Sequence, residues 1–251
     1  QATATDDGLP NPPGAMTYAW SKTSGPGTVT FGSASALATT ATFSATGLYV
    51  LQFAANDGAL QGAANVTISY GGVGGLGYTS QDIGSPALAG STSYDPGTGV
   101  YTVIGDGADI WGTDDQFQFY YTPLSGDGEV RARILGQTNT NDWAKAGVMM
   151  RETLSSNTQW YMVCNTPGNN RQVQGKVSGG TFNVGFGTGG FNWYMKITRS
   201  GNTFTAYDSS DGNTWTQRDQ RTITMAGTIC MGLAVTSHTS TALSTATFGS
   251  G

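Results

Sequence analysis

Two stretches decide the fold: Asp106-Gly-Ala-Asp-Ile-Trp-Gly-Thr-Asp-Asp115 and, later in the chain, Trp143-Ala-Lys-Ala-Gly-Val-Met-Met-Arg-Glu152. The first is an acidic turn that leads into a strand. In the second, small and apolar residues alternate with Lys145 and Arg151, so that both cations lie on one face of a strand. Together the two stretches indicate an extracellular β-sandwich that binds a ligand.

The composition predicts an all-β protein. The 251 residues include 38 Gly, and only 11% are charged. Lys and Glu, the usual residues of helix surfaces, are nearly missing, whereas β-branched residues are abundant. This composition suits many short strands joined by tight turns. The length favours two domains, each large enough to bury a core of its own.

The charge and the hydropathy limit the classes of partner. A formal charge of −5 leaves no basic stripe for phosphates, so we expect no nucleic acid. No apolar run is long enough to span a bilayer, which predicts no membrane insertion. The chain begins at Gln1 without a signal segment, as a processed secreted protein or a piece of a longer one does. We expect it at the cell surface or outside the cell, where Cys164 and Cys230 either pair or stay as buried thiols.

Residues 1–70 are expected to form the first domain. Alternating runs at 16–20, 41–43, 49–53 and 66–70 are separated by Gly, Pro and Asn turns. The segments Thr5-Asp-Asp-Gly-Leu-Pro-Asn-Pro-Pro13, Tyr18-Ala-Trp20-Ser-Lys22, Gly25-Pro-Gly27, Gly47-Leu-Tyr49 and Asn56-Asp57-Gly58 resemble PKD-like, immunoglobulin-type repeats of bacterial surface and secreted proteins. The resemblance implies that the first strand is missing and that Trp20 is the central core aromatic. Asp6, Asp7 and Asp57 are candidate calcium ligands, and turn capping is the alternative.

A Gly-rich linker, Gly71-Gly-Val-Gly-Gly-Leu-Gly77, predicts the domain boundary. Residues 78–251 then contain nine strand-like runs, at 101–104, 117–121, 129–135, 146–151, 159–165, 171–177, 193–199, 203–207 and 229–237. So many strands imply two packed sheets. With Ser80-Gln-Asp-Ile-Gly84 and Gly232-Leu-Ala-Val-Thr-Ser-His238, they resemble a concanavalin A-like (laminin-G-like) jelly-roll module of secreted multidomain bacterial proteins. The resemblance implies that the last strand is trimmed after Ala246-Thr-Phe248.

Catalytic groups are scarce in the sequence. Glycoside hydrolysis uses two carboxyl groups across a cleft, but Glu129 and Glu152, the two Glu residues, each lie near an Arg in a strand, where charge pairing explains them. The single histidine, His238, has no Gly-x-Ser-x-Gly elbow to accompany it. The spacing of the His and Cys residues fits no zinc site. We therefore expect no enzymatic activity.

Aspartate is concentrated in residues 106–115. Asp106, Asp109, Asp114 and Asp115 are candidate ligands for Ca²⁺, because short carboxylates in Gly-rich loops can wrap a hard cation. The alternative is that each Asp hydrogen-bonds its own turn. A further Asp-Gly turn in Ser209-Ser-Asp-Gly-Asn-Thr-Trp215 resembles a shortened Asp-box hairpin, with Trp215 packed beneath it.

The candidate binding residues are Trp143, Lys145, Arg151, Tyr161 and Arg171. Gly147 is expected to leave a shallow gap between Lys145 and Arg151 that a flat ligand could occupy. Sugar rings stack on exposed aromatic faces, and neighbouring polar groups orient them. Trp111, Trp160 and Trp193 are expected in the core instead.

Two functions fit these patterns. In the first, the jelly-roll domain binds a polysaccharide or cell-surface glycan, and the immunoglobulin-like domain is a spacer. In the second, both domains are building blocks of a bacterial surface layer, adhesin or filament. Neighbouring domains of a longer chain, or copies of the chain itself, would then be the partners, joined by calcium or strand pairing.

Overall fold

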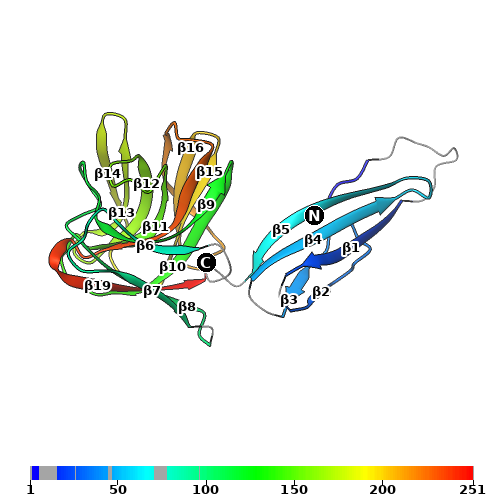
Figure 1. Ribbon diagram of the computed structural model, residues 1–251, viewed down its shortest axis with the longest axis horizontal. Coiled ribbons are helices and arrows are strands. Elements are labelled where there is room, and N and C mark those ends of the chain that lie inside the picture. Colours follow the sequence, from blue (N-terminus) through cyan, green and yellow to red (C-terminus); the bar gives the residue numbers. More distant parts are fainter. Residues whose placement is uncertain are drawn as a thin grey trace. The chain divides into compact units, whose positions relative to one another are not determined.

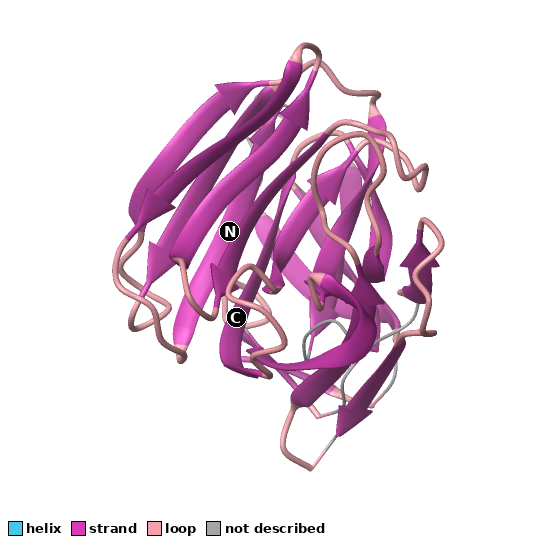
Figure 2. Cartoon of the chain, turned by 90° about the vertical axis from the view of Figure 1, so that its left-hand side faces the viewer, coloured by secondary structure: helices cyan, strands magenta, loops and turns pink. Residues whose placement is uncertain are grey.

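The computed structural model describes residues 2–5, 16–25, 27–44, 47–70, 78–95 and 97–250. These residues form strands, turns and loops without any helix (Figures 1 and 2), which confirms the all-β prediction. No helix long and apolar enough to cross a membrane is therefore found among them. The chain divides into two compact units, Gln1–Leu76 and Gly77–Gly251. The predicted linker at 71–77 and the candidate ligands Asp6 and Asp7 lie outside the described residues.

The first unit holds a three-stranded and a two-stranded antiparallel sheet. The larger sheet has the order β1 (Thr17–Ser24), β4 (Gly47–Asn56), β5 (Gln61–Tyr70), and the smaller one pairs β2 (Val29–Phe31) with β3 (Ala41–Phe43). Trp20 packs on Phe53, with ring centroids 4.9 Å apart, and its indole Nε1–H donates to the carbonyl of Ala36. Tyr49 and Leu51 of β4 are also buried. This indole therefore joins the sheet to the segment before β3.

The second unit is a sandwich of two seven-stranded antiparallel sheets. Sheet I has the order β17 (Thr216–Thr222), β16 (Thr203–Ser209), β15 (Trp193–Ser200), β10 (Gly128–Gln137), β19 (Thr239–Ser250), β8 (Val100–Gly107), β7 (Ser91–Asp95). Sheet II has the order β14 (Gly180–Phe186), β13 (Asn170–Val177), β12 (Trp160–Thr166), β11 (Lys145–Arg151), β18 (Thr228–Thr236), β9 (Phe117–Ser125), β6 (Thr79–Ile83). The nine predicted strand runs of this unit all overlap these strands, although 159–165 begins one residue before β12 and 229–237 ends one residue after β18.

The inner face of sheet II packs against sheet I. Val148 of β11 lies level with Val163 of β12 and Leu233 of β18, and all three are fully buried. Tyr161 contacts Phe204 of β16 across the two layers, with ring centroids 6.1 Å apart. Since side chains alternate along a strand, the neighbours of these residues belong to the other, outer face of sheet II.

The outer face of sheet II is covered as well. A second hydrophobic cluster there includes Met149 of β11, Trp160 and Met162 of β12, and Ile110, all buried. Ile110 belongs to the connection between β8 and β9, residues 108–116, which we call the β8–β9 loop. Because this loop lies over the sheet, Lys145 and Arg151 of β11 are buried and do not project into solvent. Whether either can contact a ligand therefore depends on its surroundings.

The expected gap at Gly147 is absent. A Cβ at this position would collide with the carbonyl oxygen of Val163 and with the backbone of Cys164 on β12. Glycine is therefore needed at 147 for close approach of the neighbouring strand, whose backbone occupies the space that a side chain would take. The prediction of a gap was wrong because it considered one strand without its neighbour. Cys164 and Cys230 are both free thiols, and burial raises the pKa of Cys164 to about 12.

Candidate functional site

Two ion pairs connect the β8–β9 loop to β11, and they join the two stretches that the sequence singled out. Asp109 pairs with Lys145 at one end of the strand, and Asp115 pairs with Arg151 at the other. The interval from Asp109 to Asp115 in the loop equals the interval from Lys145 to Arg151 in the strand, so the two pairs have the same spacing. The surroundings of the two pairs differ.

The Asp115 pair is sealed inside the protein. Arg151 is fully buried, lies 3.5 Å from Asp115, and donates to the carbonyls of Thr153 at 2.7 Å and Ser155 at 2.6 Å. Lys176 of β13 approaches the same carboxylate at 2.9 Å. Burial nevertheless raises the pKa of Asp115 to about 6, since removal from water outweighs the attraction of the two cations. This cluster holds the loop on the sheet.

The Asp109 pair borders a cavity of about 240 Å³. Two tryptophans, one paired acid and base, two amides and the single histidine contribute to its wall, which is formed by Asp109, Trp111, Trp143, Lys145, Gln174, Asn183 and His238. The β8–β9 loop supplies the first two residues, β11 and the residues before it the next two, β13 and β14 the amides, and the turn after β18 the histidine. Segments distant in sequence therefore meet at one end of the outer face.

Both carboxylate oxygens of Asp109 have a nitrogen close by. Oδ1 accepts from Lys145 Nζ and from the backbone N–H of Ile110 at 2.7 Å. Oδ2 lies 3.2 Å from His238 Nε2. His238 reaches this position through a left-handed backbone conformation, with φ of 54°, at the turn between β18 and β19. The carboxylate thus lies between Lys145 and His238, the two basic side chains of the cavity wall.

Gln174 has hydrogen-bonding capacity to spare. Its side chain is only 2% exposed, yet its Oε1 has no hydrogen-bond partner in the described part of the chain. Buried polar groups are nearly always paired, so an unpaired oxygen beside a cavity indicates a place for a ligand or water. Lys145 is 1% exposed, and Asp109 is its one hydrogen-bond partner among the residues described. An ammonium carries three donors, so it too can bind a further acceptor.

Of the five predicted binding residues, Trp143 and Lys145 line the cavity. Arg151 is buried with Asp115 and has no access to it. Tyr161 lies on the inner face, where its hydroxyl donates to Asp219 at 2.9 Å. Arg171 also lies on that face, 3.2 Å from Asp208 and with its guanidinium 3.7 Å from the ring centroid of Trp193. The predicted platform is therefore split between the two faces, because the cross-strand register was unknown from the sequence.

Three of the four predicted calcium ligands in residues 106–115 have protein partners. Asp106 accepts from the backbone of Leu88 and from the Ser237 hydroxyl, while Asp109 and Asp115 pair with cations and Asp114 is exposed. Among the described residues, no group of three or more Asp, Glu, His or Cys side chains is placed to hold a metal ion. Asp106, Asp109 and Asp115 thus make ion pairs and hydrogen bonds within the protein, and calcium binding stays a prediction.

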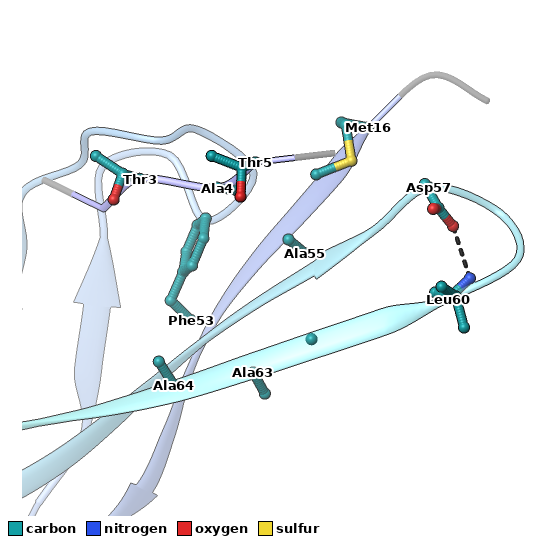
Figure 3. Close-up of a pocket in the computed structure, with 11 residues that line it drawn as sticks. Thr3, Ala4, Thr5, Met16, Phe53, Ala55, Asp57, Leu60, Ala63 and Ala64 are labelled. Carbon is teal, nitrogen blue, oxygen red and sulfur yellow. Dashed lines mark hydrogen bonds between the residues drawn. The ribbon is translucent and has the colours of Figure 1, made fainter. Parts of the chain in front are cut away.

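The first unit has a larger cavity, of about 430 Å³, drawn in Figure 3. Its wall is mostly apolar: Phe53 points toward the segment of Thr3 and Ala4, and alanines of β4 and β5 line the rest. Asp57, the candidate calcium ligand in this unit, accepts from the backbone N–H of Ala59 and Leu60, and these bonds lower its pKa. Asp57 therefore caps a turn, and this cavity offers no comparable set of donors and acceptors.

Four cavity residues were not foreseen as binding residues. Trp111 was expected in the core, His238 was considered only for catalysis, and Gln174 and Asn183 were not considered. Trp111 stands beside Asp109 in an acidic, Gly-containing loop, a context that could have suggested a partly exposed ring. Nothing in the sequence indicates that Gln174 lines a cavity, because its neighbours there include Lys145 of β11, which β12 separates from β13 in the sheet.

No family model matches the chain. Among solved structures, the chain is similar to a functionally unknown protein from Saccharomyces cerevisiae, with a TM-score of 0.53 and 14% identity over 68% of this chain and 92% of that one. A xylan β-1,4-xylosidase from Bacillus halodurans matches at a TM-score of 0.42 and 12% identity, and a sialidase at 0.41 and 10%. The xylosidase and sialidase matches each cover 80% of this chain, but only 50% of the xylosidase chain and 20% of the sialidase chain.

These comparisons contradict the prediction that the chain is not an enzyme, because glycoside hydrolases are among the structures that it matches. At such low identity the likeness concerns the all-β fold and transfers no activity. What the comparisons support is a β-sandwich protein.

Proposed function

We propose that the second unit binds carbohydrate in the cavity between Trp111 and Trp143, as part of an extracellular protein. The observation that carries the proposal is the unpaired, buried carbonyl oxygen of Gln174 in a cavity that two indoles also line. Aromatic rings offer an apolar surface to the C–H groups of a sugar. Hydroxyl groups both donate and accept, so they need the two kinds of partner that Gln174 and Lys145 provide.

The proposal extends to the organisation of the chain. The two seven-stranded sheets fit a concanavalin A-like module, and the first unit fits a PKD-like spacer that presents this module away from a neighbouring domain. The β-sandwich gives the cavity a rigid base, since Lys145, Gln174 and Asn183 belong to strands, and Asp109 and Trp111 belong to the loop fixed by the Asp115 cluster. Rigid placement of a few polar groups is typical of small-ligand sites.

A glycan array probed with the 251-residue chain and with the Trp143→Ala variant tests the proposal. We expect the chain to bind a subset of glycans, and the variant to bind them at least about tenfold more weakly through loss of ring contact. Trp215→Ala is the matched control: this half-exposed indole lies under Lys196, with the ammonium 4.1 Å from its ring centroid, and it does not line the cavity. Its binding should equal that of the parent chain.

Reducing-sugar release is measured on the same glycans, because glycoside hydrolases are among the similar structures. Retention of all binding by the Trp143 variant, or no glycan bound by the parent chain, would refute the proposed site.

A further inference from the structure

We propose that the cavity accepts one uncharged sugar ring at the end of a glycan, anchored through two of its hydroxyl groups by Lys145 and Gln174; this inference rests on the proposed function. It specifies the class of ligand, which the presence of aromatic residues alone does not. Three features of the cavity support it: its size, its charge and its unpaired groups.

The size of the cavity favours a single ring. Its volume of about 240 Å³ lies below the range of roughly 300–1,000 Å³ that is usual for pockets holding drug-sized ligands. Asn183 of β14 and His238, which follows β18, both contribute to the wall, and in sheet II these two strands are separated by β13, β12 and β11. An internal unit of a polysaccharide carries a further sugar on each side and needs an open groove. A chain end needs space on one side only, and this cavity therefore suits a terminal residue.

The charge of the cavity favours a neutral ring. The charged pair in its wall consists of one carboxylate, Asp109, and one ammonium, Lys145, in direct contact. A uronic or sialic acid would bring a second carboxylate next to Asp109, and like charges in a partly buried site repel strongly. Lys145 is already paired with Asp109, so its single positive charge cannot neutralise the carboxylate of the sugar as well. Hydroxyl groups carry no such penalty.

The unpaired groups define how the ring is held. Lys145 has donors beyond the one used by Asp109, and Gln174 Oε1 is an acceptor without a partner among the described residues. One sugar hydroxyl can accept from Lys145 while another donates to Gln174, which satisfies both groups. A sugar that lacks either hydroxyl leaves a buried polar group unpaired, and this is the kind of defect that reduces affinity most.

The matched variants are Gln174→Met and Gln172→Met. Both glutamines are buried on β13, on the same face and one alternation apart, but only Gln174 lines the cavity. Methionine keeps the length of the side chain and removes the carbonyl oxygen. Thermal unfolding of both variants provides the check that they fold.

The experiment titrates the 251-residue chain and both variants with methyl glycosides, followed by tryptophan fluorescence and ligand-observed NMR. The probes are methyl glucoside, galactoside, mannoside and xyloside, the glucuronide and galacturonide, and one deoxy analogue for each hydroxyl of the best ligand. Oligosaccharides of the same sugar are tested alongside.

We expect one neutral glycoside to bind within about tenfold of its oligosaccharides and at least about tenfold more tightly than its uronide. Two deoxy analogues and Gln174→Met should each lose about tenfold or more, and Gln172→Met should lose nothing.

The outcomes distinguish this inference from the proposed function. If oligosaccharides bind but no methyl glycoside does, or if a uronide binds best, carbohydrate binding stands and the neutral terminal ring is refuted. If Gln174→Met and Gln172→Met bind equally, the anchoring role of Gln174 is refuted. If neither oligosaccharides nor glycosides bind, the proposed function itself fails.

Discussion

The two ion pairs between the β8–β9 loop and β11 each join an aspartate to a basic residue with the same spacing, but they differ in access. Asp115 and Arg151 have side chains that are 0% exposed. Asp109 is 27% exposed, and its partner Lys145 lines a cavity. Position along one strand therefore decides whether a pair of charges fastens the fold or remains within reach of a ligand.

This difference also explains why the loop can carry a binding site. A buried ion pair adds little net stability to a fold, because removing charges from water is costly. Removing one partner is strongly destabilising, because the other charge is left buried without compensation. The Asp115 cluster thus fixes one end of the loop in one arrangement. Trp111 and Asp109, at the other end, are then held in place without being buried themselves.

The largest effect is expected from Arg151→Ala. This change removes the hydrogen bonds to the carbonyls of Thr153 and Ser155, and it leaves Lys176 as the cation beside Asp115. The free energy of unfolding should therefore fall by about 3–5 kcal/mol. Chemical denaturation measures the loss. The control is Arg131→Ala, whose guanidinium is 44% exposed and pairs with Glu129 at 3.6 Å; it should change stability by less than about 1 kcal/mol. Equal losses from the two variants would contradict the sealed role of Arg151.

The second effect concerns pH. The folded chain keeps a proton on Asp115 up to a pKa of about 6, above the ordinary value of 3.8, so this group favours the folded state most at low pH. Its contribution is complete below about pH 4 and is lost as the pH rises through about 6, a change of roughly 3 kcal/mol.

Asp115→Asn cannot titrate at this position and should therefore lack that decline. Denaturation curves between pH 4 and 7 provide the measurement. A variant whose stability follows the same course as that of the parent chain would show that Asp115 does not titrate in this range.

A smaller effect is expected from Asp109→Asn. The amide oxygen can still accept from Lys145, and the neighbouring cavity admits water, so the loss of stability should be about 1–2 kcal/mol. Chemical denaturation beside Arg151→Ala measures the contrast. A loss as large as that of Arg151→Ala would mean that the two pairs are equally structural.

The fold could be predicted from local patterns because alternation identifies strands wherever one face is apolar. Runs such as 129–135 and 193–199 were found in this way. The edge strand β14, Gly180–Phe186, was missed, since neither of its faces is buried. The predicted hairpin at Asp211 is present, because β16 pairs with β17 and Asp211 accepts from the backbone of Thr214. Trp215, however, is half-buried where a core position was expected.

The site was predictable only in part. Trp143 and Lys145 were identified because they lie close together in one segment of the sequence, separated by Ala144. Tyr161 and Arg171 were assigned to the same surface wrongly, since which face a residue occupies depends on the register between strands. Gln174 and His238 join the cavity through contacts across the sheet and through a turn, and neither kind of contact is visible in a single sequence.

The most direct measurement follows the indole N–H signals by two-dimensional NMR while the best array glycan is added. The chain has six tryptophans, so each signal reports a separate place in the molecule. The account predicts that the signals of Trp111 and Trp143 and the side-chain amide of Gln174 shift with ligand, while the other indoles stay in place. Shifts confined to Trp20, Trp160, Trp193 or Trp215 would contradict it.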